Sequence, residues 1–470
     1  SIVTLRHLEQ KCCQVREIKN LKVSLVLSHH FSTCTAIMSL LSSTSKPSFL
    51  PDSPASPPGK SSKRPRVAPT PMELADEAKL ALACTSNSNL PYIRRSSLFY
   101  LLTICSNNQN RHLLRNNGLK KQILATITAI DLNDEPCNIA SVAIFYFLTG
   151  CDKDDRPLEN SENSNFIVKF LKPISKNLKR KPSNECKAIS TKIRELLMNN
   201  DEGSSLPREG ISSKWIALMT IEKSCLPDIS FQDLPCSFNK YSDFGEKIRE
   251  HGVIDAVFNV ARECHSFLEN DGDASSSFAT MELLSISLRI MENFAFSSER
   301  NQSHLLGLRG KMKQGMRSSL SEVLISIVRI LSKFSEGVSC SIEEKADNGD
   351  DPFAFDDREI PPSKWETIDK EINRDLGQKS GRIHDRENDN ESNSLAIDCI
   401  LSCVKVLMNL ANENPIGCRQ IASCGGLETM SSLIDSQFPS LKGAIGQKLD
   451  LLVAILGFLV NMVEKNEDNR

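Results

Sequence analysis

Three stretches far apart in this chain share one pattern, and this repeat constrains the fold more than any other feature. Each is the apolar end of one helix, followed by a polar turn, a short second helix and a glycine. The stretches span 101–119 and 407–427, the third copy begins at 459–466, and a half copy lies at 248–254. Stacked units of this kind are typical of armadillo and HEAT proteins. The pattern predicts an all-α fold of irregular armadillo/HEAT-like helical repeats, an α-solenoid with a long disordered acidic loop.

The repeat is irregular, and the ends of the chain fall inside the pattern. Asn409 and Asn461 hold the same repeat position 52 residues apart, whereas a regular unit has about 40 to 47 residues. The chain starts at Ser1 rather than at a methionine, and it stops at Arg470 where the third copy enters its next helix. We therefore expect a segment of a longer protein whose repeats form a specialised surface.

Composition shifts divide the chain into five parts, whose boundaries are predictions. They are an unassigned leader (1–45), a Pro/Ser-rich disordered linker (46–71), a first helical-repeat part (72–335), a disordered acidic loop (336–392) and truncated helical repeats (393–470). The linker prolines exclude regular helix and sheet. In the acidic loop, acidic side chains outnumber basic ones about two to one and apolar residues are few, so the loop cannot repay the entropy of ordering. Residues 166–198, by contrast, are strongly basic.

Compartment and membrane state follow from cysteine usage and from apolar runs. The 16 cysteines are scattered along apolar helix faces without the spacing of a disulfide framework, which favours a reducing intracellular compartment. The longest apolar runs are Leu21–Leu41, which His29 and His30 interrupt, and Leu451–Val460. The second is shorter than the roughly 20 residues that cross a bilayer. We expect no membrane partner.

Individual helices can be read from their caps and their periodicity. Asp134 is a candidate cap for a helix with Pro136 in its first turn, where the missing N–H does no harm. A second apolar helix, 394–411, should stop before Pro415, because the residue preceding a proline avoids the helical region. Trp215 falls on the apolar face of a helix, so we expect its ring to be buried.

Motifs for catalysis are missing from the sequence. Gly59-Lys60-Ser61 resembles the end of a phosphate-binding loop, but it lies in the proline-rich linker and lacks the first glycine. The cysteines and histidines between Cys12 and Cys34 are chemically suited to zinc but poorly spaced for it. His265 beside Cys264 is more typical of a helix surface than of a nucleophile pair. These observations favour a protein that is not an enzyme and that has no metal or other cofactor.

A basic cluster in the linker is a candidate signal for nuclear import. Lys60, Lys63, Arg64 and Arg66 lie close together in a segment that should be flexible, which suits an import receptor. A solvated basic linker has the same appearance in sequence. Both interpretations stay open at this stage.

Aromatic residues within the acidic loop form a second candidate site. Phe353 and Phe355 lie among carboxylates that include Asp356 and Asp357. Large rings in a segment that cannot fold alone have no core to serve, which favours a linear motif that becomes ordered on a partner. Alternatively, the rings dock on the chain's own repeats.

Asn409 and Asn461 form the third candidate site. An asparagine near the end of an inner repeat helix can clamp the backbone of a bound peptide through its donor and its acceptor. The more ordinary interpretation is that each side chain caps its own helix or bridges to the next turn.

Several of these segments resemble one family. They are Arg94–Leu98, Leu113–Gly118, Lys214–Leu226, Leu410–Pro415, and the loop Asp351–Asp357 with the following Pro362–Trp365. Together they resemble wings-apart-like proteins, most closely the plant form, and the resemblance covers roughly 72–470. The Phe-Gly-Phe motifs of animal members do not occur here, and residues 1–45 match no part of the family.

The resemblance implies a nuclear, chromatin-associated, all-helical scaffold without catalytic activity that promotes release of cohesin from chromosomes and so regulates sister chromatid cohesion. Its implied partners are the cohesin complex and the HEAT-repeat regulators of cohesin. A different function, an importin-like or β-catenin-like armadillo adaptor for linear peptides, would require a regular period with an asparagine in most units. Direct nucleic-acid binding through 166–198 would need groove-reading side chains beside the basic ones, and we see none there, so we expect protein partners.

Overall fold

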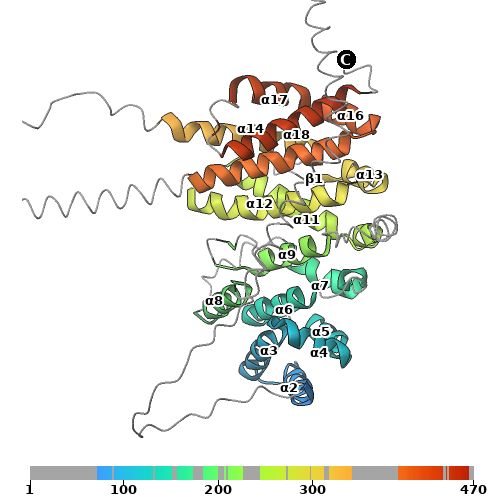
Figure 1. The fold of residues 1–470 in the computed structure, drawn as a ribbon, viewed down its shortest axis with the longest axis vertical. Coiled ribbons are helices and arrows are strands. Elements are labelled where there is room, and N and C mark those ends of the chain that lie inside the picture. The colour runs from blue at the N-terminus through green and yellow to red at the C-terminus, as the bar shows by residue number, and fades with distance from the viewer. Residues whose placement is uncertain are drawn as a thin grey trace, which may run out of the picture. The chain divides into compact units, whose positions relative to one another are not determined.

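Helices make up nearly all of the described part of the computed structural model (Figure 1). The structure describes residues 71–86, 89–130, 133–150, 156–172, 184–198, 206–207, 210–225, 244–270, 274–296, 298–311, 317–340, 390–437, 441 and 444–464. These residues fall in one unit, Ala68–Arg470. The predicted all-α, armadillo/HEAT-like fold is confirmed.

The helices have the following bounds. They are α2 (Pro71–Cys84), α3 (Pro91–Ser106), α4 (Asn108–Asn116), α5 (Leu119–Thr128), α6 (Glu135–Leu148), α7 (Ser161–Leu171), α8 (Asn184–Met198), α9 (Ser213–Cys225), α11 (Val253–Leu268), α12 (Ala274–Ala295), α13 (Glu299–Gly307), α14 (Leu320–Cys340), α16 (Pro415–Ser423), α17 (Gly426–Ser432) and α18 (Ile445–Val463), with a 3-10 turn η1 (Pro157–Glu159) and a π-helical extension η5 (Leu433–Gln437). The helix Asn390–Ala411, orange in Figure 1, is called helix 390–411. Residues 244–250 are also helical.

The long helices are stacked in two layers. The first layer consists of α3, α6, α9, α12, helix 390–411 and α18, and its members neighbour one another in that order (Figure 1). The second layer consists of α5, α7, α11, α14 and α17, again as successive neighbours. Contacts of α7 with α9 and of α11 with α12 join the layers. Each helix therefore buries one face between layers and another between repeats, as in an α-solenoid.

Glycines with left-handed backbone confirm that the repeated segments are equivalent. Gly118, Gly252 and Gly425 have φ values of 69°, 68° and 78°, and each directly precedes a helix of the second layer. Residues with a Cβ are strained at such angles, whereas glycine adopts them freely. The half copy at 248–254 thus makes the same turn as the two longer copies.

Polar side chains cap the short helix that opens each repeat turn. The side chains of Asn107, Ser298 and Asn414 accept hydrogen bonds from the backbone amide three residues further on, at 3.1, 3.4 and 3.1 Å. Such caps satisfy amides that the helix itself leaves unpaired. Asn414 thus both follows the end of helix 390–411, as predicted, and begins α16.

Asp134 does not cap α6 as its sequence position predicts. Its side chain makes no capping bond to the helix and instead accepts two hydrogen bonds from Arg95 of α3, at 2.9 and 2.7 Å. Burial acts to raise the pKa of Asp134, but the hydrogen bonds and charge of Arg95 outweigh it and lower that pKa. A charged partner from the neighbouring helix has replaced the local cap.

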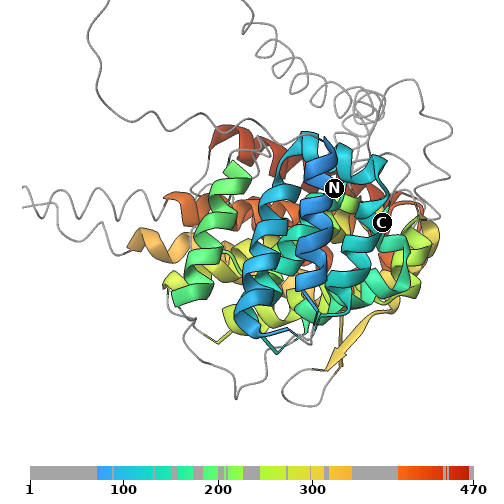
Figure 2. The same ribbon diagram turned by 90° about the horizontal axis from the view of Figure 1, so that it is seen from below.

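A two-stranded hairpin interrupts the helices, and the sequence pattern did not predict it. β1 (Arg309–Lys311) pairs antiparallel with β2 (Arg317–Ser319), with Arg309 opposite Ser319. Figure 2 shows the hairpin projecting from the stacked helices. Strands this short and polar carry no period-two apolar signal, so sequence periodicity cannot reveal them.

The core is aliphatic, with aromatic residues concentrated around α6. Phe145 is fully buried and its ring lies 6.0 Å, centroid to centroid, from that of Phe166 on α7. Trp215 is 5% exposed, which confirms that it is a buried residue of α9.

Two helices, helix 390–411 and α18, are long and apolar enough to cross a membrane by length and composition alone. Helix 390–411 lies between α12 and α18, so packing within the protein accounts for its apolar surface. On α18, Ile445, Leu449 and Leu456 are exposed.

A candidate protein-binding groove

A groove of about 380 Å³ opens on the first layer, where α9, α12 and helix 390–411 run side by side. Its lining residues come from α9, from α12, from the first half of helix 390–411 and from the segment before α9. They are Leu206, Trp215, Met219, Phe278, Glu282, Ser285, Ile286, Arg289, Glu391, Ser394, Leu395 and Asp398. The groove therefore combines six apolar side chains with four charged ones and two serines.

The apolar part of the lining belongs to the core. Trp215, Met219 and Ile286 are 5%, 7% and 3% exposed, so most of their surface is already packed within the protein. Nearly the whole length of α9 is buried, from Trp215 to Glu222. A ligand in the groove would therefore meet a floor that is fixed by packing between helices.

A charged pair holds the polar side of the groove in place. Arg289 of α12 donates to both carboxylate oxygens of Glu222 on α9, at 2.5 and 3.1 Å, and to Ser285 Oγ at 2.9 Å. Burial acts to lower the pKa of Arg289, but the hydrogen bonds and charge of Glu222 raise it overall. Because the bidentate hydrogen bond to Glu222 fixes the guanidinium plane, Arg289 has one defined orientation at the groove.

Gln447 of α18 fixes the opposite wall. Its Nε2 donates to Ser394 Oγ and to Asp398 Oδ1, both at 2.8 Å. Burial raises the pKa of Asp398, although the Gln447 bond and the charges of Arg289 and Lys405 act against this rise. Two of the four lining residues from helix 390–411 are thus held by the next helix of the layer.

Asn409 and Asn461 make bonds inside the layer. Asn409 Nδ2 donates to the carbonyl of Glu292 on α12 at 3.2 Å, and Asn461 Nδ2 donates to the carbonyl of Met408 at 2.9 Å. The two bonds have the same geometry one repeat apart, so they form a ladder between successive helices. Each bridge uses one of the two N–H groups of the asparagine amide and runs to a neighbouring helix of the layer. The clamp itself stays a prediction.

The remaining predicted site residues lie outside the described residues. These are the basic cluster (Lys60, Lys63, Arg64 and Arg66), the acidic loop with Phe353, Phe355, Asp356 and Asp357, and the leader and linker that precede residue 71. Three helix ends lie near predicted boundaries. α2 begins at Pro71, next to the predicted start of the repeats at 72. α14 continues to Cys340, past the predicted end at 335, and helix 390–411 begins at Asn390, before the predicted 393.

The surface position expected for His265 is wrong, because the residue is only 2% exposed and lies beside the buried Cys264. Burial raises the pKa of the Cys264 thiol to about 12, so the thiolate is scarce near neutral pH. His265 Nε2 lies 2.9 Å from Ser326 Oγ on α14, and burial lowers the pKa of this ring. Among the described residues, no three His, Cys, Asp or Glu side chains are grouped to hold a metal ion.

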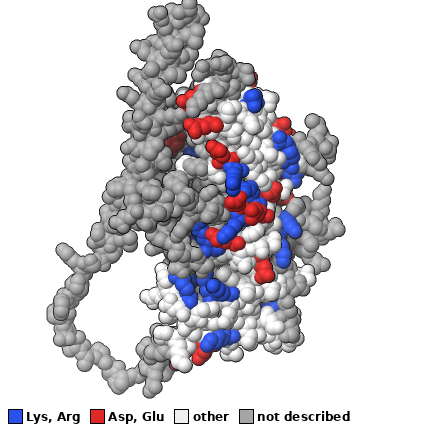
Figure 3. Space-filling view, turned by 90° about the vertical axis from the view of Figure 1, so that its right-hand side faces the viewer, with Lys and Arg blue, Asp and Glu red and all other residues white. Residues whose placement is uncertain are grey.

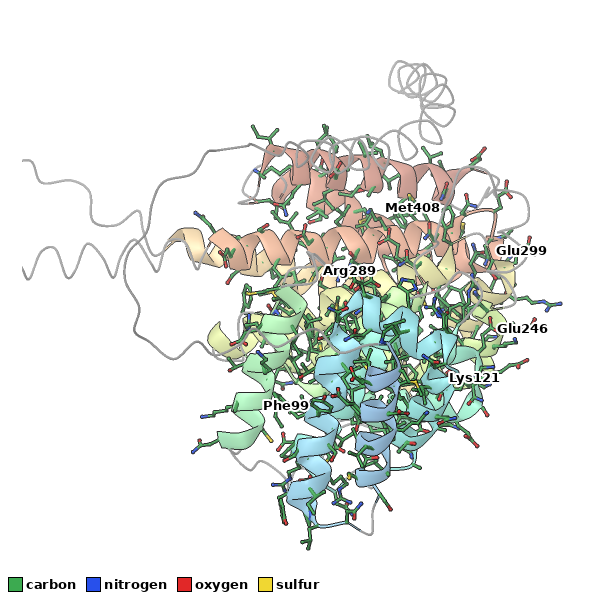
Figure 4. All side chains as sticks on the ribbon, turned by 60° about the horizontal axis from the view of Figure 1, so that its bottom comes forward. Phe99, Lys121, Glu246, Arg289, Glu299 and Met408 are labelled. Carbon is green, nitrogen blue, oxygen red and sulfur yellow. The ribbon has the colours of Figure 1, made fainter. Side chains whose placement is uncertain are left out.

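On a second charged surface, away from the groove, acidic and basic side chains are paired with one another. Figure 3 shows acidic and basic side chains intermixed on the side formed by α7 and α13. There Glu246 lies 3.1 Å from Arg249 and 2.9 Å from Arg300, and Glu159 lies 2.7 Å from Lys247. Figure 4 places Glu246 and Glu299 at this edge, and Arg289 well apart from them. Exposed ion pairs of this kind contribute little to stability.

The sequence pattern does not reveal the groove, because the lining residues are spread between 206 and 398. A weak signal exists within single helices, since Arg289 and Asp398 each interrupt an apolar run. A charge in such a position either faces solvent or has a partner, but no spacing rule shows that the two lie on neighbouring helices.

Comparison with known proteins places the chain in a family. A family model described as "Wings apart-like protein regulation of heterochromatin" matches residues 71–469. The chain is 27% identical to Wings apart-like protein 2 of Arabidopsis thaliana, over 85% of this chain and 73% of that protein. Its identity to Wings apart-like protein 1 of the same plant is 26%, over 85% and 68%. The human Wings apart-like protein homolog is 21% identical, and the match covers 29% of its length. These matches confirm the resemblance seen in the sequence, and the chain belongs to the Wings apart-like family.

Proposed function

We propose that this chain is a non-catalytic scaffold that promotes release of cohesin from chromosomes and thereby regulates sister chromatid cohesion. The observation that supports this proposal is the family match, which extends over nearly every described residue. A stack of helical repeats offers a long surface for protein partners. The proposed site of action is the nucleus, on chromatin.

The proposed partners are the cohesin complex and its HEAT-repeat regulators. Two surfaces of the chain suit such partners. The first is the groove on α9, α12 and helix 390–411, whose floor and walls are fixed by buried contacts. The second is the acidic aromatic loop with Phe353, Phe355, Asp356 and Asp357, which suits a basic patch on a partner.

Nuclear import is proposed to depend on Lys60, Lys63, Arg64 and Arg66. Replacing all four by alanine in the full chain, fused to a fluorescent protein, should shift the protein toward the cytoplasm. An equal number of lysine and arginine replacements among residues 166–198 serves as the control. Unchanged nuclear signal in the first variant would assign this cluster to a solvated linker.

Co-purification from nuclei tests the function most simply. The protein is isolated with an affinity tag under mild salt, and the bound proteins are identified by mass spectrometry. We expect cohesin subunits and the HEAT-repeat regulators to be enriched above a tag-only control. Recovery of the intact protein without any cohesin subunit would contradict the proposal.

A further inference from the structure

We propose that the chain forms a dimer in which α18 of one copy packs antiparallel against α18 of a second copy. The interface is the α18 stripe, a row of aliphatic residues along one face of this helix. Its members are Ile445, Leu449, Leu452, Leu456, Leu459 and Val463. The inference does not depend on the proposed function, because it concerns only how the chain associates with itself.

The α18 stripe is exposed to water over much of its length. Ile445, Leu449 and Leu456 are 87%, 58% and 46% exposed, and Val453 beside them is 43% exposed. The other three members of the stripe are partly buried. The four exposed side chains present roughly 450 Å² of aliphatic surface, within the about 300–600 Å² of the largest apolar patch on a typical monomer. Patches of this size often mark an interaction site.

The opposite face of α18 is fixed in the stack, so the helix cannot rotate to hide its stripe. Ile455 and Phe458 are fully buried on that face. Gln447 near one end and Asn461 near the other donate hydrogen bonds to helix 390–411. Insertion into a bilayer would break these bonds and strip the core contacts, although α18 is apolar enough to span one. The fixed position therefore favours a protein helix as the occupant of the stripe.

The spacing of the stripe suits a second α18. Its members follow one another by four, three, four, three and four residues, the alternation that keeps a seam on one side of a helix and packs it against a like seam. This order reads the same from either end, so the stripe is self-complementary about a two-fold axis, as a symmetric dimer requires. The pairs that meet across the axis are Ile445 with Val463, Leu449 with Leu459, and Leu452 with Leu456, each formed twice.

The antiparallel direction follows from the helix dipoles. Antiparallel pairing places the positive N-terminus of each α18 beside the negative C-terminus of the other, which is favourable. Parallel pairing would place like ends together. The dipoles therefore select between the two symmetric arrangements.

The exposed area matches what a stable dimer requires. A standard interface buries about 800 Å² from each partner, and about 65% of it is apolar in homodimers. The apolar requirement is thus roughly 500 Å² per copy, close to the roughly 450 Å² that the exposed side chains of α18 supply. Lys448 and Asp450 lie beside the stripe and would contribute to a polar rim.

Sedimentation equilibrium of the full chain over a range of concentrations tests the dimer. We expect the mass to rise from the monomer to twice that value as the concentration increases. Leu456→Glu should raise the dissociation constant at least about tenfold, because it places a carboxylate against Leu452 of the partner subunit without a counter-charge. Leu449→Glu, at a more exposed position, should do the same.

A matched control separates the α18 stripe from a general effect of added charge. Leu80 on α2 is 69% exposed, so Leu80→Glu makes the same replacement on another helix and should leave the dimer intact. All three positions are exposed, and circular dichroism should show the melting temperature of the parent monomer in each variant.

Cysteine cross-linking tests the direction of the pair. A mixture of Ile445→Cys chains and Val463→Cys chains should form a disulfide-linked dimer above the background of the parent cysteines. Ile445→Cys chains alone should not, because antiparallel pairing separates the two copies of this residue by about 27 Å along the helix axis.

Three outcomes would overturn the inference. They are a monomer mass at every concentration, a dimer that both glutamate variants of the stripe leave unchanged, and cross-linking of Ile445→Cys chains with one another. A stripe that binds lipid vesicles or a different helical protein gives the first outcome. Because none of these measurements involves cohesin, their failure is distinct from failure of the nuclear co-purification.

Discussion

Helix α6 and helix 390–411 occupy the same layer but differ in what surrounds them. α6 is buried along almost its whole length by apolar and aromatic contacts, with Phe145 and Phe147 fully enclosed. Helix 390–411 also contributes to the core, but it holds Asp398 beside the groove and Lys405 3.5 Å from Glu292 of α12.

This difference suggests that the two regions contribute to different properties, namely the stability of the fold and the recognition of partners. Apolar burial is the dominant favourable term in folding, so the region around α6 is suited to holding the stack together. Partly exposed charges contribute little net stability, because desolvation offsets their attraction. The same charges favour partners of one chemistry over another. We therefore expect stability to depend mainly on the region around α6, and binding specificity mainly on the region around helix 390–411.

The largest expected effect is on the stability of the α6 region. Phe145→Ala removes a buried ring that stacks on Phe166, and it should lower the free energy of unfolding by about 3–5 kcal/mol. Chemical denaturation followed by circular dichroism measures this loss. A loss similar to that of an exposed replacement such as Tyr92→Ala would remove the distinction between the regions.

The acidic loop competes with the groove as the binding surface. Replacing Phe353 and Phe355 by alanine removes two rings, whose burial could contribute roughly 3–6 kcal/mol before ordering costs. We expect a loss of at least about tenfold in affinity for purified cohesin regulators, measured at two salt concentrations. Unchanged affinity at both salts would remove the loop from binding and leave the repeat surface as the candidate.

The pair between Glu222 and Arg289 should contribute modestly to stability. The Arg289 side chain is 40% exposed and that of Glu222 is 11% exposed, so Glu222→Gln should cost about 1–2 kcal/mol. A double-mutant cycle with Arg289→Met isolates the coupling between the two side chains. A coupling free energy as large as the loss in Phe145→Ala would show that this charged pair stabilises the fold as strongly as the buried ring does.

The asparagine ladder should affect stability and leave binding intact. Asn409→Ala removes one interhelical hydrogen bond and should cost about 1 kcal/mol, with Asn461→Ala as its matched counterpart one repeat away. Affinity for cohesin regulators should stay at the parent level in both variants. A selective loss of affinity at parent stability would restore the peptide-clamp hypothesis.

The smallest effect concerns pH and the buried His265. Burial lowers the pKa of His265 in the folded state below its ordinary value. The unfolded chain therefore binds more protons between that lowered pKa and about 6.5, and stability should fall as the pH drops below about 6.5. His265→Gln should flatten this part of the stability profile, as measured by thermal unfolding across the pH range. An unchanged slope would assign the pH dependence to other groups.

Patterns within a single segment of the chain predict the repeats, but they do not reveal the groove, which depends on contacts between distant helices. Gly118, Gly252 and Gly425 have a left-handed backbone angle that glycine adopts without strain, so their equivalence is visible in sequence. Burial of Trp215 follows from helix periodicity in the same way. The partners of Arg289 and Asp398 lie on other helices, many residues away, and Asp134 exchanged a predicted cap for Arg95 of α3. Such pairings depend on how helices stack, which periodicity does not specify.

The amount of cohesin on chromatin tests the central claim most directly. Cells that lack the full-length protein are compared with cells that express it again, and chromatin-bound cohesin is quantified by fractionation and immunoblotting. We expect more bound cohesin in the cells that lack the protein and a return to the parental level on re-expression. Equal amounts of bound cohesin with and without the protein would contradict a role in cohesin release.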